Sequence, residues 1–230
     1  MSVERPPSLF AGVQEPDAGP PPDPRRELIG AARELCARGL TVSSLGNASV
    51  RAGSRIWITP TRVVAAELED AQIVALDLSG ARRGGGVPSC ELPLHLEIYR
   101  RWPRTGAVVH THSPCAVAWS HRGLALSHPT EELRYHGLSC IPCAAPAPAA
   151  TAELARAAAE ALRHGPVALL ASHGVVARAA SLRHAIELCA LAEQQARIEW
   201  LLLVVAALGD GPSAARPGVH PQAARGAAQT

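Results

Sequence analysis

The chain has 230 residues, a formal net charge of +2 and 18% charged residues. A chain of this length can bury a sizeable core and fits one domain. Its near-neutral charge, without a basic run, argues against nucleic acid or an anionic membrane as a partner, and its longest apolar stretch, residues 200–208, is too short to cross a bilayer. Six cysteines in a chain this long are not typical of a disulfide scaffold, so we expect reduced thiols and a cytoplasmic protein.

The two ends of the chain differ in composition from its middle. Residues 1–23 are rich in proline, glycine and acidic side chains and have almost no periodic apolar pattern, which predicts a disordered leader. Residues 209–230 contain three prolines and predict a disordered tail. We therefore expect one folded domain over residues 24–208.

The amino-terminal half of this domain carries helix and strand signals in alternation. Asp23 and Pro24 have the residue types of an N-cap and a first helical turn, and apolar residues then recur at helical spacing until Gly39. Gly53 separates two apolar segments and predicts a hairpin. The expected elements are a helix that ends at Gly39, strands over 46–50, 55–59 and 73–76, and a helix over 91–101.

The carboxy-terminal half continues this pattern. Thr151 precedes a periodic segment with an acidic residue in its first turn, which predicts a capped helix. The expected elements are strands over 107–112, 139–142, 167–172 and 175–177, and helices over 114–119, 151–162 and 181–208. Because the strands cluster in the middle of the chain and helices flank them, the residues favour a mixed α/β domain with antiparallel strand pairs.

Three histidines follow apolar strand segments. His110 and His112 close the segment 107–112, and residues two apart on a strand point to the same face, so both imidazoles can bind one metal ion. His173 follows another apolar segment, and Gly174 beside it allows the backbone to approach a site closely. A catalytic zinc ion uses three protein ligands and an open position, and these histidines match that number.

Glu91 opens the helix expected over 91–101. A carboxylate at this position often does no more than interact favourably with the helix dipole. Beside a metal ion it could instead act as a general base on a carbon acid. The local sequence favours the first role, so the second depends on a metal site close by.

Five short motifs occur in order along the chain. They are Leu45-Gly46-Asn47-Ala48-Ser49-Val50-Arg51, Ile58-Thr59-Pro60-Thr61, Pro88-Ser89-Cys90-Glu91, Ala107-Val108-Val109-His110-Thr111-His112 and Ser172-His173-Gly174. Through them the chain resembles the class II aldolase/adducin family over roughly residues 25–205. Each motif alone is modest, but five in this order are specific for the family. They are not specific for one substrate.

The resemblance implies a three-layer αβα fold around a central, mostly antiparallel sheet, and a homotetramer with active sites at the subunit interfaces. It implies that His110, His112 and His173 bind a divalent metal ion, with Zn2+ the expected ion, and that Glu91 is the catalytic acid/base. The implied activity is that of a metal-dependent lyase of carbohydrate metabolism. Such an enzyme cleaves a C–C bond beside a carbonyl in a small hydroxylated substrate, for example a phosphorylated sugar, through an enediolate on the metal.

The resemblance also implies a pocket for an anionic group of the substrate. Its backbone and hydroxyl donors come from the positions of Gly46, Asn47, Thr61 and Ser89. Two neighbours depart from the pattern of the family's aldolases: Arg62 replaces a glycine, and Cys90 replaces a serine and is a poorer donor. Arg62 could bind a phosphate or carboxylate with two hydrogen bonds, fill the pocket, or remain a solvated surface residue.

A third departure lies after the paired histidines. By its interval, Glu131 stands where the aldolases have a proton-donating tyrosine, so it could be a replacement acid or contact a different substrate. Two further interpretations therefore stay open. One is a decarboxylase or dehydratase of a hydroxy-keto acid on the same metal site, with Arg62 binding the carboxylate. The other is a non-catalytic interaction domain like the head of adducin, which would have no need for the three histidines and Glu91.

Overall fold

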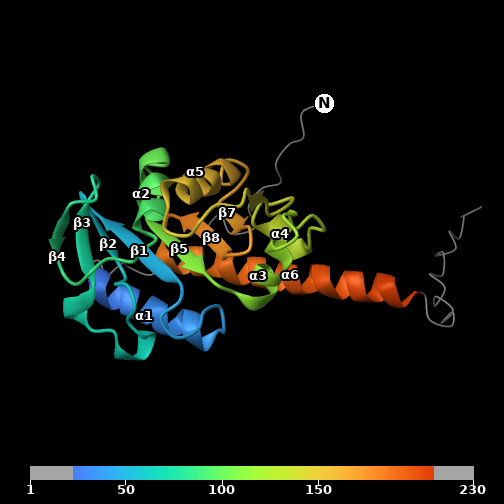
Figure 1. The fold of residues 1–230 in the computed structure, drawn as a ribbon, viewed down its shortest axis with the longest axis horizontal. Coiled ribbons are helices and arrows are strands. Elements are labelled where there is room, and N and C mark those ends of the chain that lie inside the picture. Colours follow the sequence, from blue (N-terminus) through green and yellow to red (C-terminus); the bar gives the residue numbers. More distant parts are fainter. Residues whose placement is uncertain (1–22, 210–230) are drawn as a thin grey trace, which may run out of the picture.

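A mixed sheet of eight strands forms the centre of the molecule (Figure 1). The computed structural model describes residues 23–209, so the expected disordered leader and tail fall outside the described residues except for one residue each. In spatial order the strands are β4-β3-β2-β1-β5-β8-β7-β6, and every neighbouring pair is antiparallel except β6–β7. The strands are β1 (Asn47–Ala52), β2 (Arg55–Ile58), β3 (Val74–Asp77), β4 (Arg82–Gly84), β5 (Ala107–Thr111), β6 (Cys143–Ala144), β7 (Val167–Leu170) and β8 (Gly174–Ala179).

Helices cover both faces of this sheet, as Figure 1 shows. The helices are α1 (Pro24–Ala37), α2 (Leu92–Arg101), α3 (Pro114–Ser120), α4 (Glu131–Tyr135), α5 (Ala152–Ala161) and α6 (Leu182–Leu208), with 3-10 turns at Ala65–Glu67 and Asp70–Gln72. Buried residues of α1, α3, α4 and α6 share one hydrophobic cluster, and those of α2 and α5 share another. The expected three-layer αβα fold with a mostly antiparallel sheet is therefore confirmed.

The central strand β5 explains why both clusters form. Successive side chains on a strand point to opposite faces. Ala107 and Val109 accordingly pack in the cluster under α1 and α6, whereas Val108 packs in the cluster under α2 and α5. All three are fully buried, and a strand covered on both faces has a continuous apolar sequence for this reason.

The predicted helix starts are confirmed at the level of individual hydrogen bonds. The Asp23 carboxylate accepts from the Arg25 backbone N–H at 3.0 Å, with Pro24 in the first turn of α1. The Thr151 hydroxyl accepts from the Leu154 backbone N–H at 3.1 Å at the start of α5. These caps satisfy backbone donors that have no partner inside a helix.

Two short strands differ from the sequence prediction. The strand expected over 139–142 is wrong: β6 begins only at Cys143, after Pro142, and Ile141 makes an isolated bridge with Leu126. Pro142 has no backbone N–H and cannot donate to a ladder. The edge strand β4 was not predicted, because its residues are all exposed and carry no apolar alternation.

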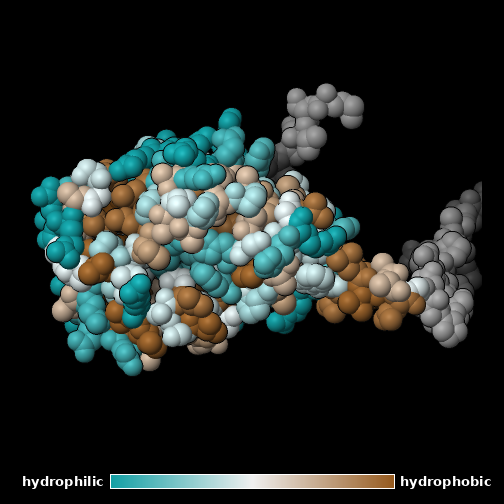
Figure 2. Space-filling model, viewed as in Figure 1, coloured by the Kyte–Doolittle hydropathy of each residue, from teal (hydrophilic) through white to brown (hydrophobic). Residues whose placement is uncertain are grey.

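Helix α6 extends well beyond the sheet (Figure 1). Its last turns have large apolar side chains that are between 38% and 79% exposed, at Leu201, Leu202, Leu203, Val204, Val205 and Leu208. Figure 2 shows this end of the helix as a continuous hydrophobic surface. Within residues 23–209, no helix combines the length and apolar character needed to cross a membrane. Residues 23–209 therefore leave the apolar end of α6 uncovered.

Candidate metal centre

The paired histidines lie at the end of β5. His110 is the fourth residue of the strand and fully buried, and His112 follows the strand and is half-buried. Their Nε2 atoms are 3.0 Å apart. The Nδ1 atom of His110 lies 2.8 Å from the carbonyl oxygen of Val175 on the neighbouring strand β8. Because a carbonyl only accepts, His110 Nδ1 carries the hydrogen, and the lone pair at Nε2 is free to bind a metal ion.

His173 reaches the same place from the tight turn between β7 and β8. Its backbone N–H donates to the Leu170 carbonyl at 3.0 Å, and Ser172 before it has a positive φ of 56°. Gly174 after it lies so close to β5 that a Cβ atom there would be 2.0 Å from the Thr111 carbonyl oxygen. The prediction that Gly174 permits a close backbone approach is therefore confirmed.

The three imidazoles form one cluster. Each residue offers a ligand atom that lies within 4.8 Å of the other two, and the ring centroids are between 4.7 and 5.0 Å apart. Burial lowers the pKa of all three imidazoles. At His110 and His112 the neighbouring rings lower it further, and the pKa of His112 falls to about 4. The rings are thus neutral near pH 7, which is the form that binds metal.

This donor set fits a divalent metal ion. Three neutral imidazoles lie close enough together to share one ion, and three protein ligands are the number found in a catalytic zinc site. The Nδ1 atom of His173 is buried and has no hydrogen-bond partner among the described residues. A buried nitrogen without a partner carries an energetic cost that a bound cation near the cluster would help to offset.

The carboxylate of Glu91 lies beside this cluster. Glu91 is the N-cap residue of α2, is 4% exposed, and places Oε1 at 3.7 Å from Nε2 of His173. The backbone N–H of Ala150 donates to the same oxygen at 3.0 Å. Burial raises the pKa of Glu91 and this hydrogen bond opposes the rise. One oxygen is thus held in place, and the carboxyl can both take up and release a proton.

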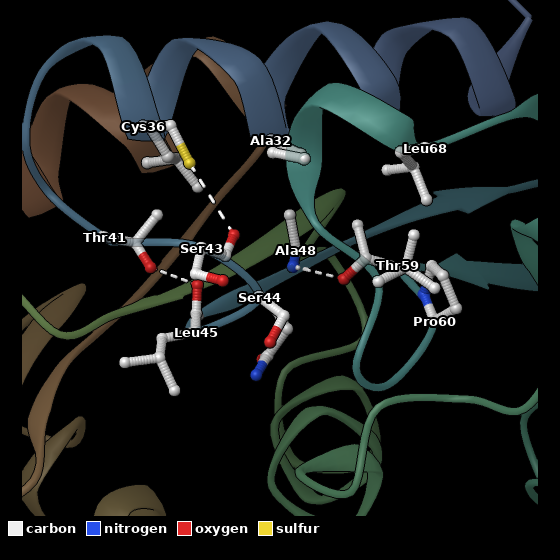
Figure 3. Close-up of a pocket in the computed structure, with 15 residues that line it drawn as sticks. Ala32, Cys36, Thr41, Ser43, Ser44, Leu45, Ala48, Thr59, Pro60 and Leu68 are labelled. Atoms are coloured by element: carbon white, nitrogen blue, oxygen red, sulfur yellow. Dashed lines mark hydrogen bonds between the residues drawn. The ribbon is translucent and has the colours of Figure 1, made fainter.

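The loop before β1 lines a pocket together with residues of α1 and of the segment after β2 (Figure 3). Gly46 has a φ of +76°, and a Cβ atom there would lie 2.9 Å from the carbonyl oxygen of His110. The Thr41 hydroxyl donates to the Leu45 carbonyl, and the Ala48 N–H donates to the Thr59 hydroxyl at 3.1 Å. Asn47 pairs with His110 across β1 and β5. Gly46 and Asn47 are therefore close to His110, and their role in binding an anionic group stays a prediction.

A second loop meets the helix that carries Glu91. The Thr61 N–H donates to the Val87 carbonyl, and the Ser89 N–H donates to the Thr59 carbonyl, at 3.0 and 3.1 Å. In this antiparallel pairing Thr61 lies opposite Val87, two residues before Ser89, and the buried Ser89 hydroxyl accepts from the Glu91 N–H. The structure thus brings the segments of Thr61 and Ser89 together.

The three departures from the family pattern lie in different surroundings. Arg62 is exposed and has a φ of 59°. Cys90 is exposed beside Glu91. Glu131 is the first residue of α4, and its side chain is 87% exposed and paired with Arg134 at 2.6 Å. Within one chain the structure does not join Glu131 to the histidine cluster, so its predicted role as an acid stays a prediction.

Comparison with known proteins decides the family. The chain matches the family model described as Class II Aldolase and Adducin N-terminal domain over residues 26–200. The chain belongs to this family. The shared region includes all three histidines and Glu91, and ends just before the exposed apolar turns of α6.

This member of the class II aldolase/adducin family resembles several aldolases that act on sugar phosphates. The chain is 37% identical over 182 residues to a 5-methylthioribulose-1-phosphate/5-deoxyribulose-1-phosphate aldolase of Rhodospirillum rubrum, covering 79% of this chain and 82% of that protein. It is 32% identical over 182 residues to the L-fuculose phosphate aldolase of Escherichia coli strain K12, covering 78% and 84%. A solved L-fuculose-1-phosphate aldolase from Thermus thermophilus superposes with a TM-score of 0.72 at 32% identity, covering 82% and 97%.

Strained backbone conformations in this family member occur in the loops around Glu91, His173 and the pocket of Figure 3. The described residues other than glycine with positive φ are Ser43, Arg62, Ala150 and Ser172. Ser43 lines the pocket of Figure 3, Ala150 donates to Glu91, and Ser172 precedes His173. Such conformations cost of order 1–3 kcal/mol each and persist only where the surrounding structure requires them. Their location supports a functional role for these loops.

Sequence reasoning did not single out two residues at this site. His95 was assigned no role, yet it is fully buried and bonded to Asn47 and Ser49. It lies four residues after Glu91, and this helical spacing is a signal that could have indicated a shared face. Ala150 gave no signal, because its contribution is a backbone N–H in a loop 59 residues away from Glu91.

Proposed function

We propose that this protein is a divalent-metal-dependent lyase of the aldolase type. It cleaves a C–C bond beside a carbonyl in a small hydroxylated substrate that carries a phosphate. The observation that carries this proposal is the convergence of His110, His112 and His173 on one point, with the Glu91 carboxylate 3.7 Å from His173. The names of the relatives, which are sugar-phosphate aldolases, support the same class of substrate.

His110, His112 and His173 would hold the metal ion, and zinc is the ion that we propose because three imidazoles with an open position suit it. When bound, such an ion supplies Lewis-acid polarisation of a substrate carbonyl. The protein's own contribution is to keep the three rings neutral and in place. The hydrogen bond from His110 Nδ1 to the Val175 carbonyl sets the tautomer and the ring orientation.

Glu91 is the group that we assign to proton transfer. Burial raises its pKa and so brings the carboxyl nearer to the range in which it can both accept and return a proton. The Ala150 N–H holds Oε1, which leaves Oε2 for the substrate. Proton transfer at a carbon next to the carbonyl would then need no movement of the helix that carries Glu91.

The pocket for the substrate's anionic group is assigned to two loops. Gly46 and Asn47 come from the start of β1 and the residue before it, and Thr61, Ser89 and Cys90 come from the pair of segments before α2. Backbone N–H groups and hydroxyls are suitable donors to a phosphate. Arg62 lies at the exposed edge of this region and adds a positive charge.

A screen with added divalent ions tests the proposal most directly. The purified chain would be assayed against sugar phosphates and hydroxy-keto acids, with aldehyde and CO2 measured together. Aldehyde release from a sugar phosphate supports the aldolase. Release of CO2 would favour the decarboxylase, in which Arg62 binds a carboxylate. Absence of metal uptake on titration would contradict both enzymes and favour an interaction domain.

Replacing Arg62 by glycine tests its role in anion binding. We expect Arg62→Gly to raise the KM for a phosphorylated substrate roughly 10-fold or more, because a hydrogen bond to a charged group contributes about 1.5–3 kcal/mol. Stability should not fall, because glycine adopts a φ of 59° without strain. Steady-state kinetics and urea unfolding measure the two effects. Arg33→Ala on α1 is the matched control for loss of an exposed positive charge, and an unchanged KM in Arg62→Gly would favour a solvated surface residue.

We also propose that the chain forms a homotetramer with its active sites at subunit interfaces. The exposed apolar end of α6 supports association, because a contiguous apolar patch on a single chain commonly marks an interface. We expect Val205→Glu to shift sedimentation from the tetramer to smaller species, while Leu78→Glu, on an exposed turn away from α6, stays tetrameric. A monomeric wild-type protein would refute the proposal.

The six cysteines are all free thiols. Free thiols in this number support a reducing compartment, and we propose the cytoplasm.

A further inference from the structure

Four buried polar side chains form a hydrogen-bonded chain behind the metal cluster. The Tyr99 hydroxyl lies 3.0 Å from Ser49 Oγ, which lies 2.7 Å from His95 Nδ1. On the other side of the ring, His95 Nε2 lies 2.5 Å from Asn47 Oδ1. Tyr99, Ser49 and His95 are at most 1% exposed, so no solvent replaces these bonds. Buried polar groups of this kind require partners, and each one restricts the next.

This chain ends next to the metal ligands. Asn47 on β1 is paired with His110 on β5, and directly opposite residues of two antiparallel strands put their side chains on the same face. His95 lies one helical turn after Glu91 on α2, so one helix positions both side chains. The Asn47 amide therefore stands between His95 and the histidine cluster.

The direction of the hydrogen bonds follows from the donors available. A phenol is a stronger donor than an aliphatic hydroxyl, so Tyr99 donates to Ser49, and Ser49 donates to His95 Nδ1. Burial lowers the pKa of His95 to about 3, which keeps the ring neutral with a single N–H. That hydrogen is then on Nε2 and is donated to Asn47 Oδ1. At the other end of the chain, the Arg51 guanidinium donates to the Tyr99 backbone carbonyl at 3.0 Å and lies over the Tyr99 ring. These contacts fix the position of Tyr99.

This direction leaves the NH2 group of Asn47 for a ligand. Among residues 23–209, no acceptor takes a hydrogen bond from Asn47 Nδ2. Asn47 is 7% exposed, and it is one of the residues that line the pocket between α1 and the start of β1. An amide whose oxygen is already bonded can present only its donor to the substrate.

We propose that His95 is a positioning residue that, through the chain Tyr99–Ser49–His95, fixes the Asn47 amide so that its NH2 group faces the anionic group of the substrate. The proposal rests on the lyase function and its anion pocket, and it adds a residue to which no role had been assigned. His95 itself touches neither the substrate nor the metal. By bonding the Asn47 oxygen, it sets the orientation of the amide and leaves the NH2 group for the substrate.

The tautomer of His95 tests the proposal without any turnover. In the 15N NMR spectrum of the full-length wild-type protein, we expect His95 to carry its hydrogen on Nε2, with the resonances assigned by their loss in His95→Gln. A hydrogen on Nδ1 would overturn the proposal, because His95 would then accept from the Asn47 NH2 group and turn the amide oxygen toward the pocket. This measurement stands even if wild-type protein lacks lyase activity, an outcome that would refute the proposed function alone.

Two variants at His95 separate positioning from a structural role. Glutamine can place a donor near the position of Nε2, whereas asparagine reaches only to the position of Nδ1. We expect His95→Asn to raise the KM for a phosphorylated substrate about 10-fold with kcat within about 2-fold, and His95→Gln to keep KM within about 3-fold of wild type. A structural role alone would lower kcat in both variants at unchanged KM, because only the active fraction would fall. That result would overturn the proposal.

A double-mutant cycle with Asn47 completes the test. In the Asn47→Ala background, His95→Asn should change KM by less than about 2-fold, because the amide that it orients is gone. Equal effects of His95→Asn in both backgrounds would contradict the proposal. Melting temperatures of all variants show whether each measurement reports on folded protein.

Discussion

Glu91→Gln is expected to lower kcat between about 10²- and 10⁴-fold, the range typical of a lost general acid–base group. Glutamine has nearly the same shape and keeps an oxygen that can accept the Ala150 N–H, so the fold at the start of α2 should persist. Bound metal should remain at the wild-type amount, because the histidines are unaltered. Steady-state kinetics and metal analysis of the same preparation measure the two quantities.

Glu97→Gln on the same helix is the matched control, because it removes one negative charge away from the histidine cluster. It should leave kcat within about 2-fold of wild type, as expected for a residue that does not contact the reacting atoms. If Glu91→Gln were as active as this control, proton transfer would have to be assigned to another group.

His112→Ala is expected to remove the bound metal while leaving a folded protein. Structural zinc sites with four ligands bind with about 10–16 kcal/mol, so one ligand accounts for roughly 3 kcal/mol, or about 100-fold in affinity or more. His112 is half-buried and lies after β5, so its loss leaves the sheet pairing intact. Metal analysis after gel filtration, together with the far-ultraviolet circular dichroism spectrum, would establish both results.

The exposed His164 supplies a control for this experiment. His164→Ala removes an imidazole from the turn after α5 and should retain one metal ion for each chain. Stoichiometric metal in His112→Ala would count against the three-histidine site. Loss of the circular dichroism signal would shift the test to metal titration of His112→Gln, which must still bind more weakly than wild type.

The cluster of three histidines could be predicted because its signals are local. His110 and His112 are two residues apart on an apolar strand, and His173 follows another strand of the same kind. The register of β5 against β8 then brings them together. Helix starts were also predictable, because capping depends on residues within one turn.

Contacts between distant segments escaped the sequence prediction. The hydrogen bond from Ala150 to Glu91 joins residues 59 positions apart, and that from His95 to Asn47 joins residues 48 positions apart. No periodicity encodes either contact. The short helix α4 and the polar edge strand β4 were missed for a different reason, since five and three residues are too few to show a period.

The four left-handed residues around the site also bear on how this protein could be made more heat-stable. Ser43, Arg62, Ala150 and Ser172 are the positions that a backbone-based search would choose first for glycine, since each strained residue costs about 1–3 kcal/mol. Yet Ser43 lines the pocket of Figure 3, Ala150 donates to Glu91, and Arg62 and Ser172 are the chain neighbours of Thr61 and His173. Stability gained there would trade against activity, so engineering for heat resistance should begin on the far ends of the sheet.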